Sequence, residues 1–571
     1  MTGRLRRLLR AGALAAATAL MLSACTGLPT NGDVNVGLEL GESPDDTDFL
    51  PLASGPAPGA DPQEIVEGFM EASITPADNW EIARRFLTPD MQRDWRPGTG
   101  VSIDASAIER SVSSNVAEDD DEAQEAGVDV VLAQVASVDA AGAYSSSPGS
   151  SNLAFALERT NGEWRISQAP DGVVIDQDRF AKVFEGYPLQ YFDSTWSRLV
   201  PDLRWFPRRA SIATTVTRAL IGGEPSAWLD PAVQSAFPAD VQLAQDAVPI
   251  NANQVAEVAL TRPASSLDSA TLARMRTQLQ ATLQASGVHV AQVRFTVDGR
   301  GLDAGIVSVV DPPADTGPLV LLDGAFGSIV GDEVVPIDAI SEELTGIAQP
   351  IVTIDVAADD TRAAVQLSDR HVYLVSDGRV DELDLRDGLV APSLDPYGYT
   401  WSVPSGAPAA LTAWSSEVAE QKIADAWPDA SSVEAIRVSA DGARIAAVIT
   451  VGAQRWAVVS AIVRDEDGTP TAIGEMTQLR RIDAAVDGLV WIGDYRIGLL
   501  VDPESPELVT QMVGGVGFAE SSPAGATALA GARSAAGVRV LDTDGALFTH
   551  AGSAWREIAT GVAVLATRAG Q

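Results

Sequence analysis

Short turn sequences containing aspartate recur through the C-terminal part of the chain, and their spacing constrains the fold more than any other feature. Asp395 and Asp441 lie 46 positions apart, and Asp487 follows after another 46. From about Pro318 onward, short strand-forming runs separate the turns. A repeat of roughly 40–45 residues with four short strands per unit is typical of a β-propeller. We therefore predict an all-β propeller over residues 318–571, with room for roughly six blades.

Tryptophans follow several of these turns. We expect them to pack between blades, because a large apolar ring is stabilised by burial. The alternative is that some face outward on the top of the propeller and contact a sugar or a partner protein. The residues concerned are Trp401, Trp456, Trp491 and Trp555. One stretch of this region, Glu417 to Trp427, has an ambiguous, helix-like pattern.

The amino end has the layout of a bacterial secretion signal. Four arginines between positions 4 and 10 precede a 12-residue apolar stretch, Ala11 to Leu22. That stretch is too short to cross a bilayer comfortably, so residues 1–24 are predicted to be a removable signal peptide. No later segment offers 18 consecutive apolar residues.

The signal ends in Leu22-Ser23-Ala24-Cys25, which resembles the bacterial lipobox. There, diacylglycerol is attached to the cysteine sulfur, the chain is cut before the cysteine, and the new amino group is often acylated. The alternative is a buried cysteine that happens to follow an apolar run. Several acyl chains on Cys25 would exceed the one-chain limit for stable anchoring. We therefore expect a lipid anchor at Cys25 on the extracytoplasmic face of the cell membrane.

Charge and cysteine content exclude several function classes. The 571 residues include 78 Asp and Glu against 39 Lys and Arg, for a net charge of -39. Such a chain repels phosphate backbones, so nucleic acid is not an expected partner. A single cysteine excludes an internal disulfide, a thiolate zinc site and an iron–sulfur cluster. No compact catalytic motif occurs, so we predict no cofactor, no metal and no enzymatic activity.

Two mixed domains are predicted between the anchor and the propeller. Residues 25–60 are rich in Pro, Gly, Ser and Asp, which predicts a flexible tether. Residues 61–180 begin with a helix capped by Asp61, continue with a second helix from Trp80 to Leu87 that stops before Pro89, and then turn to strands. Helices followed by a meander suggest a cystatin- or NTF2-like α+β domain. Residues 187–305 alternate strands and helices, which predicts a second α+β domain.

Isolated histidines and acidic turns offer weak candidates for metal binding. His289 is predicted inside a strand, and neither His371 nor His550 has a His or Cys neighbour in sequence. The loops at Asp465 and Asp542 resemble calcium loops, but the twelfth position counted from Asp542 is Ser553 rather than Glu. Ordinary turn chemistry of aspartate is the favoured interpretation.

Four parts of the chain together resemble the actinobacterial lipoprotein LpqB family, which is built from an N-terminal domain, a GerMN domain and a β-propeller. The first part is the lipobox, and the other three are marked by the segments Glu64 to Ala72, Ala83 to Thr88 and Trp95 to Pro97; by Leu203 to Pro207, Leu220 to Gly223 and Val297 to Gly299; and by Leu394 to Trp401. Each motif alone is moderately specific, and their common order over nearly the whole mature chain carries the resemblance.

The resemblance implies a role beside a two-component system. A lipoprotein of this family is expected to engage the extracytoplasmic domain of an MtrB-like sensor histidine kinase and to modulate signalling in cell-wall homeostasis and division. The family offers no catalytic residues to transfer. The competing hypothesis is an extracytoplasmic glycan-binding or hydrolytic propeller, which would need carboxylate pairs converging in the central channel.

Overall fold

The computed structural model describes residues 54–76, 79–117, 122–208, 211–311, 317–331, 333–552 and 554–571. Residues Leu22, Ser23, Ala24 and Cys25 lie outside these ranges, as do the signal peptide and most of the predicted tether. Within the described ranges, no helix combines the length and the apolar character needed to cross a membrane. Residues 50–571 form one compact unit.

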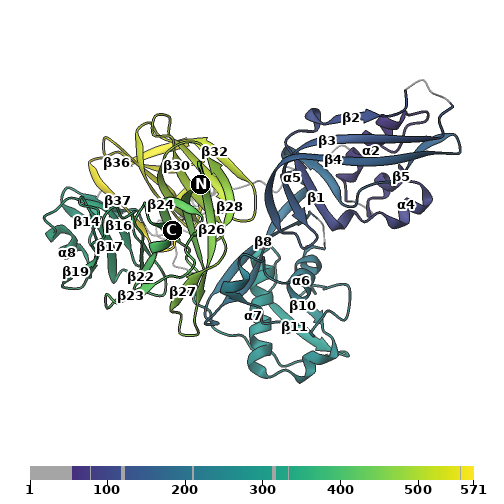
Figure 1. The fold of residues 1–571 in the computed structure, drawn as a ribbon. Helices are drawn as coiled ribbons and strands as arrows, with labels where there is room; N and C mark the ends of the chain where they lie inside the picture. The colour runs from purple at the N-terminus through teal and green to yellow at the C-terminus, as the bar shows by residue number, and fades with distance from the viewer. Residues whose placement is uncertain are drawn as a thin grey trace, which may run out of the picture. The chain divides into compact units, whose positions relative to one another are not determined.

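The first domain wraps a mixed sheet around helix α2 (Pro62–Ser73), and Figure 1 shows this helix lying along the long strands β3 (Glu125–Asp139) and β4 (Tyr144–Thr160). Asp61 accepts hydrogen bonds from the backbone N–H groups of Gln63 and Glu64, and Glu64 bonds back to the N–H of Asp61. This reciprocal capping, together with Pro62 in the first turn, begins the helix where the sequence predicts it.

The sheet of the first domain has strand order β5-β4-β3-β1-β6, with β2 paired to β3. The turn Asn161-Gly162 joins β4 to β5, and both residues have positive φ angles of 55° and 86°, as a tight hairpin with the right-handed strand twist requires. The strands are β1 (Gly100–Asp104), β2 (Ser111–Ser114), β3 (Glu125–Asp139), β4 (Tyr144–Thr160), β5 (Glu163–Gln168) and β6 (Val173–Asp176).

The predicted helix from Trp80 to Leu87 is wrong in its extent. Helix α3 (Glu81–Arg84) is short, and Pro89 begins helix α4 (Pro89–Asp94) instead of following a helix end. The reason is tertiary: the carbonyl of Phe86 accepts the N–H of Ile166 at 2.9 Å, and the N–H of Thr88 donates to the carbonyl of Ile166 at 2.9 Å. Pairing with β5 draws this segment out of the helix.

The second domain carries two long helices against two small sheets. Helix α5 (Gln177–Val183) leads into strands β7 (Phe184–Asp193) and β8 (Leu199–Pro207), which pair antiparallel. Helix α7 (Ser269–Ala285) packs on β7, where the amide of Gln278 donates to the carbonyl of Gln190 at 2.8 Å. The remaining elements are α6 (Ile212–Gly222), β9 (Val233–Gln234), β10 (Val255–Ala259), α7 (Ser269–Ala285), β11 (Gln292–Val297) and β12 (Arg300–Gly301).

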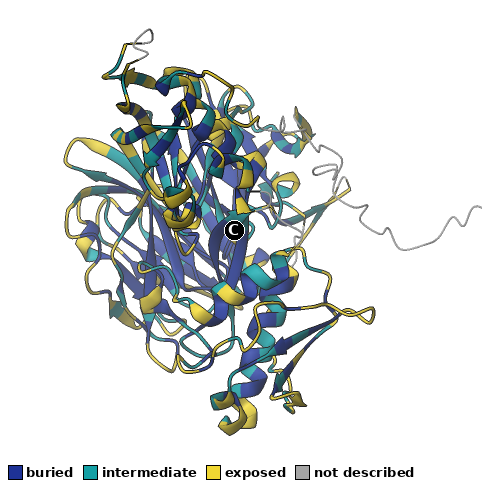
Figure 2. Cartoon of the chain, turned by 90° about the vertical axis from the view of Figure 1, so that its right-hand side faces the viewer, coloured by how far each residue is buried: buried dark blue, intermediate teal, exposed yellow. Residues whose placement is uncertain are grey.

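The C-terminal region is a propeller, and in the described part of the chain it has six blades of four strands around a common axis. Figure 2 colours buried residues dark blue, and many strands of the propeller are buried along most of their length. The complete middle blades are β16 (Ile351–Val356), β17 (Arg362–Leu367), β18 (Val372–Ser376) and β19 (Arg379–Asp384); β20 (Ser393–Leu394), β21 (Thr400–Ser402), β22 (Thr412–Trp414) and β23 (Glu420–Lys422); and β24 (Ala430–Val438), β25 (Arg444–Val451), β26 (Gln454–Arg464) and β28 (Thr477–Ile482), with β27 (Pro470–Ile473) at the end of β26.

The ring is closed by strands from both ends of the region. Strand β37 (Val562–Arg568) pairs antiparallel with β13 (Leu319–Leu322), which continues into β14 (Ala325–Val330) and β15 (Glu333–Val335). On its other side β37 bridges to β16, with Asp355 opposite Thr567. The last two blades are β29 (Val486–Ile492), β30 (Arg496–Val501), β31 (Glu507–Met512) and β32 (Gly517–Ser521), then β33 (Ala526–Ala530), β34 (Arg539–Asp542), β35 (Leu547–Ala551) and β36 (Ala554–Ala559).

Helix is rare in the propeller, as the sequence predicts. Helix α8 (Ser341–Gly346) is the one α-helix among its described residues. The ambiguous stretch from Glu417 to Trp427 holds strand β23 and turns, and Val418, Asp425 and Trp427 have positive φ angles that a right-handed helix does not allow.

Candidate functional site

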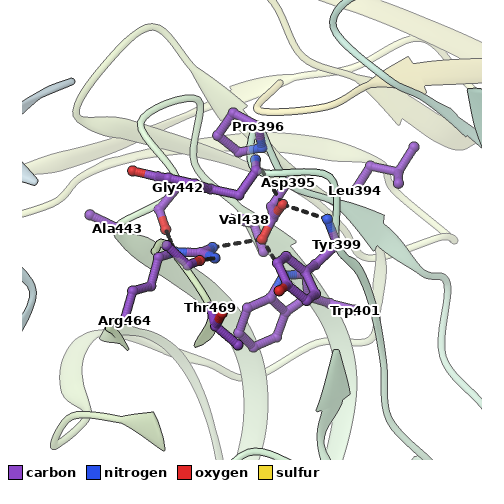
Figure 3. A network of polar contacts seen from close by, with 12 residues as sticks. Leu394, Asp395, Pro396, Tyr399, Trp401, Val438, Gly442, Ala443, Arg464 and Thr469 are labelled. Carbon is purple, nitrogen blue, oxygen red and sulfur yellow. Dashed lines mark hydrogen bonds and ion pairs between the residues drawn. The ribbon is translucent and has the colours of Figure 1, made fainter. Parts of the chain in front are cut away.

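The family-like stretch from Leu394 to Trp401 forms a buried polar network around Asp395 (Figure 3). This carboxylate accepts the backbone N–H groups of Tyr397 and Tyr399 on Oδ1, at 2.9 and 2.8 Å. Its Oδ2 accepts the Trp401 indole N–H at 2.9 Å and the Arg464 Nη2 at 2.6 Å. The exposed fraction is 0% for the Asp395 side chain and 3% for that of Arg464. Both charges are therefore removed from water and depend on each other.

Arg464, at the end of β26, ties three turns from two blades together. Its Nε donates to the carbonyl of Gly442 at 3.0 Å, its Nη1 to that of Gly468 at 2.9 Å, and its Nη2 to Asp395. The guanidinium also lies over the Tyr397 ring, 4.2 Å from its centre. Each of its three nitrogens has an acceptor, so the network is a structural clamp and offers no free group for chemistry.

Tyr397 carries the network into the second domain. Its hydroxyl donates to Asp193 Oδ2 at the end of β7, and the hydroxyl of Thr195 donates to the same oxygen. Burial and the Asp193 carboxylate raise the pKa of Tyr397, so its hydroxyl keeps the proton that it donates. Burial of Asp193 would raise the pKa of its carboxyl, but hydrogen bonds from Thr195, Tyr397 and two backbone N–H groups outweigh burial and lower it. A neutral donor thus meets an ionised acceptor.

Two glycines leave room for the Tyr397 ring. Gly442 and Gly468 have φ angles of 74° and 82°, and a Cβ on Gly442 would lie 2.7 Å from Tyr397 Cε2 and 2.8 Å from Pro396 Cγ. The ring cannot retreat easily, because Asp193 holds its hydroxyl and Arg464 covers its face.

Replacing Gly442 with Ala should therefore destabilise the chain by roughly 2–4 kcal/mol, the sum of left-handed backbone strain and overpacking. The matched control is Gly452→Ala, because Gly452 has a φ of 61° with nothing within 4 Å of the new Cβ. That variant should lose only the strain, about 1 kcal/mol. Urea unfolding of both proteins measures the difference, and equal losses would mean that the Tyr397 slot has no steric role.

The first of the two predicted 46-residue intervals matches the blade repeat, and the second does not. Asp395 and Asp441 lie at equivalent positions in two neighbouring blades, each in the turn between the first and second strand of its blade. Asp441 Oδ1 accepts the N–H of Ala443 at 2.9 Å. Asp487 instead lies inside β29, the innermost strand of its blade. The turn that corresponds to Asp441 in that blade holds Asp494. The second interval is therefore a coincidence of spacing.

The four tryptophans differ in burial. Trp401 and Trp491 are 0% and 1% exposed and pack against residues of two neighbouring blades, as predicted. Trp456 and Trp555 are half-buried. The indole of Trp555 donates to the carbonyl of Ser521 at 3.0 Å. None of the four forms part of the channel wall described below.

The two loops that resemble calcium loops, at Asp465 and Asp542, are held by ordinary hydrogen bonds from the backbone to the aspartate side chain, as predicted. Asp465 Oδ1 accepts the N–H groups of Asp467 and Thr469, and Asp542 Oδ1 accepts those of Asp544 and Ala546, all at 2.8–3.0 Å. Ser553 lies outside the described residues. Within the ranges that the structure describes, no group of three or more His, Cys, Asp or Glu is placed to hold a metal ion.

The histidines lie apart from one another in the fold. His289 is exposed in the loop before β11, so its predicted place inside a strand is wrong. His371 precedes β18 and lies 3.3 Å from Asp369, and His550 lies in β35, 3.1 Å from Glu520.

A channel of about 470 Å³ runs along the propeller axis. The inner strands β16, β24, β29, β33 and β37 form its wall, together with Val390 and Ala391 just before β20. Two carboxylates line it: Glu434, which is ion-paired with Arg455 at 2.7 Å, and Asp487. No aromatic side chain lines it among the described residues, so a sugar ring would find no flat face to stack on.

Three family models match this chain in the order that the fold shows. They are the LpqB lipoprotein N-terminal domain over residues 55–181, the sporulation and spore germination domain over residues 188–303, and the LpqB β-propeller domain over residues 368–566. The predicted succession of a mixed N-terminal domain, a GerMN domain and a propeller is confirmed.

Curated relatives extend the match over most of the chain. A protein named lipoprotein LpqB from Streptomyces coelicolor is 27% identical over 534 residues, which cover 86% of each chain. Its namesake from Thermobifida fusca is 26% identical over 90% of each chain. The namesake from Rhodococcus opacus is 30% identical, over 39% of this chain and 36% of its own.

Solved structures offer weaker likenesses. The tandem GerMN domains of the sporulation protein GerM from Bacillus subtilis are 16% identical with a TM-score of 0.18, over 35% of this chain and 62% of theirs. A chain of a nidogen/laminin complex is 10% identical with a TM-score of 0.32, over 43% of this chain and 96% of its own. These scores are too low to support an argument about the fold.

Proposed function

The chain belongs to the LpqB lipoprotein family, and from that premise we propose that it is a non-catalytic, lipid-anchored extracytoplasmic protein that modulates a sensor kinase. Its partner would be the outer domain of an MtrB-like two-component kinase, and its signalling would act on cell-wall homeostasis and division. The observation that carries the proposal is the succession of three family domains behind a lipobox at Cys25.

The proposed mature chain begins at Cys25. Residues 25–60 would act as the tether, and the domains would span residues 61–180, 187–305 and 318–571. A lipid on Cys25 would place all three domains at the membrane surface, where a sensor kinase exposes its outer domain. Confinement to that surface raises the local concentration of both proteins, so even a weak contact is populated.

Charge supports a particular kind of contact. A net charge of -39 favours a partner with a basic patch and speeds the encounter in a salt-dependent way. Regulation further requires that the lipoprotein bind the active and inactive forms of the kinase with different affinities, because equal affinity shifts no equilibrium.

A deletion strain tests the proposal. We expect loss of this protein to change the phosphorylated fraction of the cognate response regulator, and the anchored protein to restore it. An unanchored version, secreted behind an ordinary cleavable signal peptide, keeps the folded domains but lacks the lipid and should restore it poorly. The same strains allow detergent extraction and identification of co-purified kinases. Unchanged phosphorylation in every strain, with no kinase co-purified, would contradict the proposal and favour the glycan-binding alternative.

A further inference from the structure

The propeller channel carries polar groups that the protein itself does not satisfy. Its volume of about 470 Å³ falls in the range of small-molecule sites. Gln366 lines it with an exposed fraction of 1%, and its amide nitrogen donates to the carbonyls of Arg370, Leu389 and Val390 at 3.0–3.2 Å. Its side-chain oxygen accepts no hydrogen bond from the described residues. The buried hydroxyl of Thr353, on the same wall, also has no partner among them.

Arg437 supplies a cation to the same channel. It is 8% exposed, its Nε donates to the carbonyl of Leu489 at 3.2 Å, and its Nη1 donates to that of Pro392 at 2.7 Å. Its second terminal nitrogen, Nη2, makes no hydrogen bond within the described part of the chain. The nearest carboxylate is Asp355, 3.8 Å from Nη1, and it is already hydrogen-bonded by Leu394 and Thr567. One edge of the guanidinium is therefore available to an anion.

Asp487 supplies an anion to the same channel. It lies on β29 at the bulge where the register with β30 shifts between Val486 and Gly488, two residues before Leu489, whose carbonyl binds Arg437. The Asp487 side chain is open to the channel and has no ion-pair partner among the described residues, and partial burial raises the pKa of its carboxyl.

The channel is thus lined by the guanidinium of Arg437, the carboxylate of Asp487, and the side-chain oxygen of Gln366 and the hydroxyl of Thr353, both unpaired among the described residues. A forked guanidinium fits a carboxylate, and a carboxylate fits an ammonium group. A peptide carries a carboxylate and an ammonium group at its two ends and amide groups between them, and a channel of about 470 Å³ has room for only a few residues. The Gln366 oxygen and the Thr353 hydroxyl match the N–H and C=O of a peptide bond.

We propose that the propeller channel binds a short peptide of two or three residues, with its carboxylate on Arg437 and its amino group on Asp487. This inference concerns a small ligand and does not depend on the proposed contact with a kinase. The occupied channel would satisfy the polar groups that the protein leaves open.

Calorimetric titration of the full mature chain with alanyl-alanine tests the proposal. We expect saturable binding, weakened about tenfold or more when the carboxylate is blocked as the amide or the amino group is acetylated. N-acetylglucosamine, which has neither charge, should not bind. Absence of alanyl-alanine binding to folded protein, equal binding of the blocked peptides, or preference for the sugar would each overturn the proposal.

Variants locate the site. Asp487→Asn should weaken alanyl-alanine about tenfold and leave the acetylated peptide unchanged, because only the free amino group needs the carboxylate. Asp544→Asn removes the same charge from an exposed turn outside the channel and should change nothing. Arg437→Lys keeps the charge but loses the fork, and should weaken every peptide that has a free carboxylate. Because Arg437 also supports the blade, its thermal unfolding is measured in parallel, and Asp487→Asn decides the outcome if that variant does not fold. An Asp487→Asn protein that binds both peptides like the parent would refute the assignment.

Discussion

Replacing Asp395 with Ala should destabilise the propeller by roughly 3–5 kcal/mol, because it leaves the Arg464 guanidinium buried without its counter-charge. Arg464 is 3% exposed and cannot turn to water without giving up the Gly442 and Gly468 carbonyls. The Trp401 indole would lose its acceptor as well. For a domain of this size the loss corresponds to a fall in Tm of roughly 10 °C, measured by calorimetry.

Asp542 provides a matched control for this variant. Its Oδ1 accepts backbone N–H groups two and four residues ahead at 2.9 and 2.8 Å, the same pattern and lengths as in Asp395. It has no ion pair with arginine and accepts no indole N–H among the described contacts. Asp542→Ala should therefore lose only the hydrogen bonds of its turn and lower the free energy of unfolding by about 1 kcal/mol. If the two variants lost equal stability, the buried ion pair between Asp395 and Arg464 would contribute nothing to stability beyond the turn hydrogen bonds.

Replacing Cys25 with Ser should abolish fatty-acid labelling and cleavage before position 25. The hydroxyl cannot receive the diacylglyceryl group as a thioether, and cleavage before position 25 depends on that modification. Each buried CH₂ of an acyl chain contributes about 0.8 kcal/mol to membrane binding, so the variant loses the anchoring that the acyl chains provide. Labelled fatty acid and the N-terminal sequence measure the two consequences.

Ser23→Ala is the control for the anchor. It keeps a small side chain beside the predicted cleavage site, so labelling and cleavage should persist. A Cys25→Ser protein that still incorporates fatty acid and is still cut before position 25 would show that the anchor lies elsewhere.

Local sequence was sufficient wherever neighbouring residues decide the structure. The start of α2 follows from Asp61, Pro62 and Glu64 within one turn of helix, and the β4–β5 hairpin follows from Asn161-Gly162. Recurring turns and short strand-forming runs predicted a propeller with room for roughly six blades, because turn residues and short strands depend on neighbouring residues. The order of the family motifs in turn predicted the succession of domains.

Tertiary structure decided everything that depends on distant partners. Asp395 meets Arg464, Tyr397 meets Asp193 and β13 pairs with β37, although each pair is far apart in the sequence. Pro89 begins a helix because the preceding residues pair with β5, and Asp487 faces the channel because β29 is the innermost strand of its blade. Residue patterns record the preferences of a few neighbouring residues, whereas these contacts form only when the packing of whole domains compensates the entropy of bringing distant segments together.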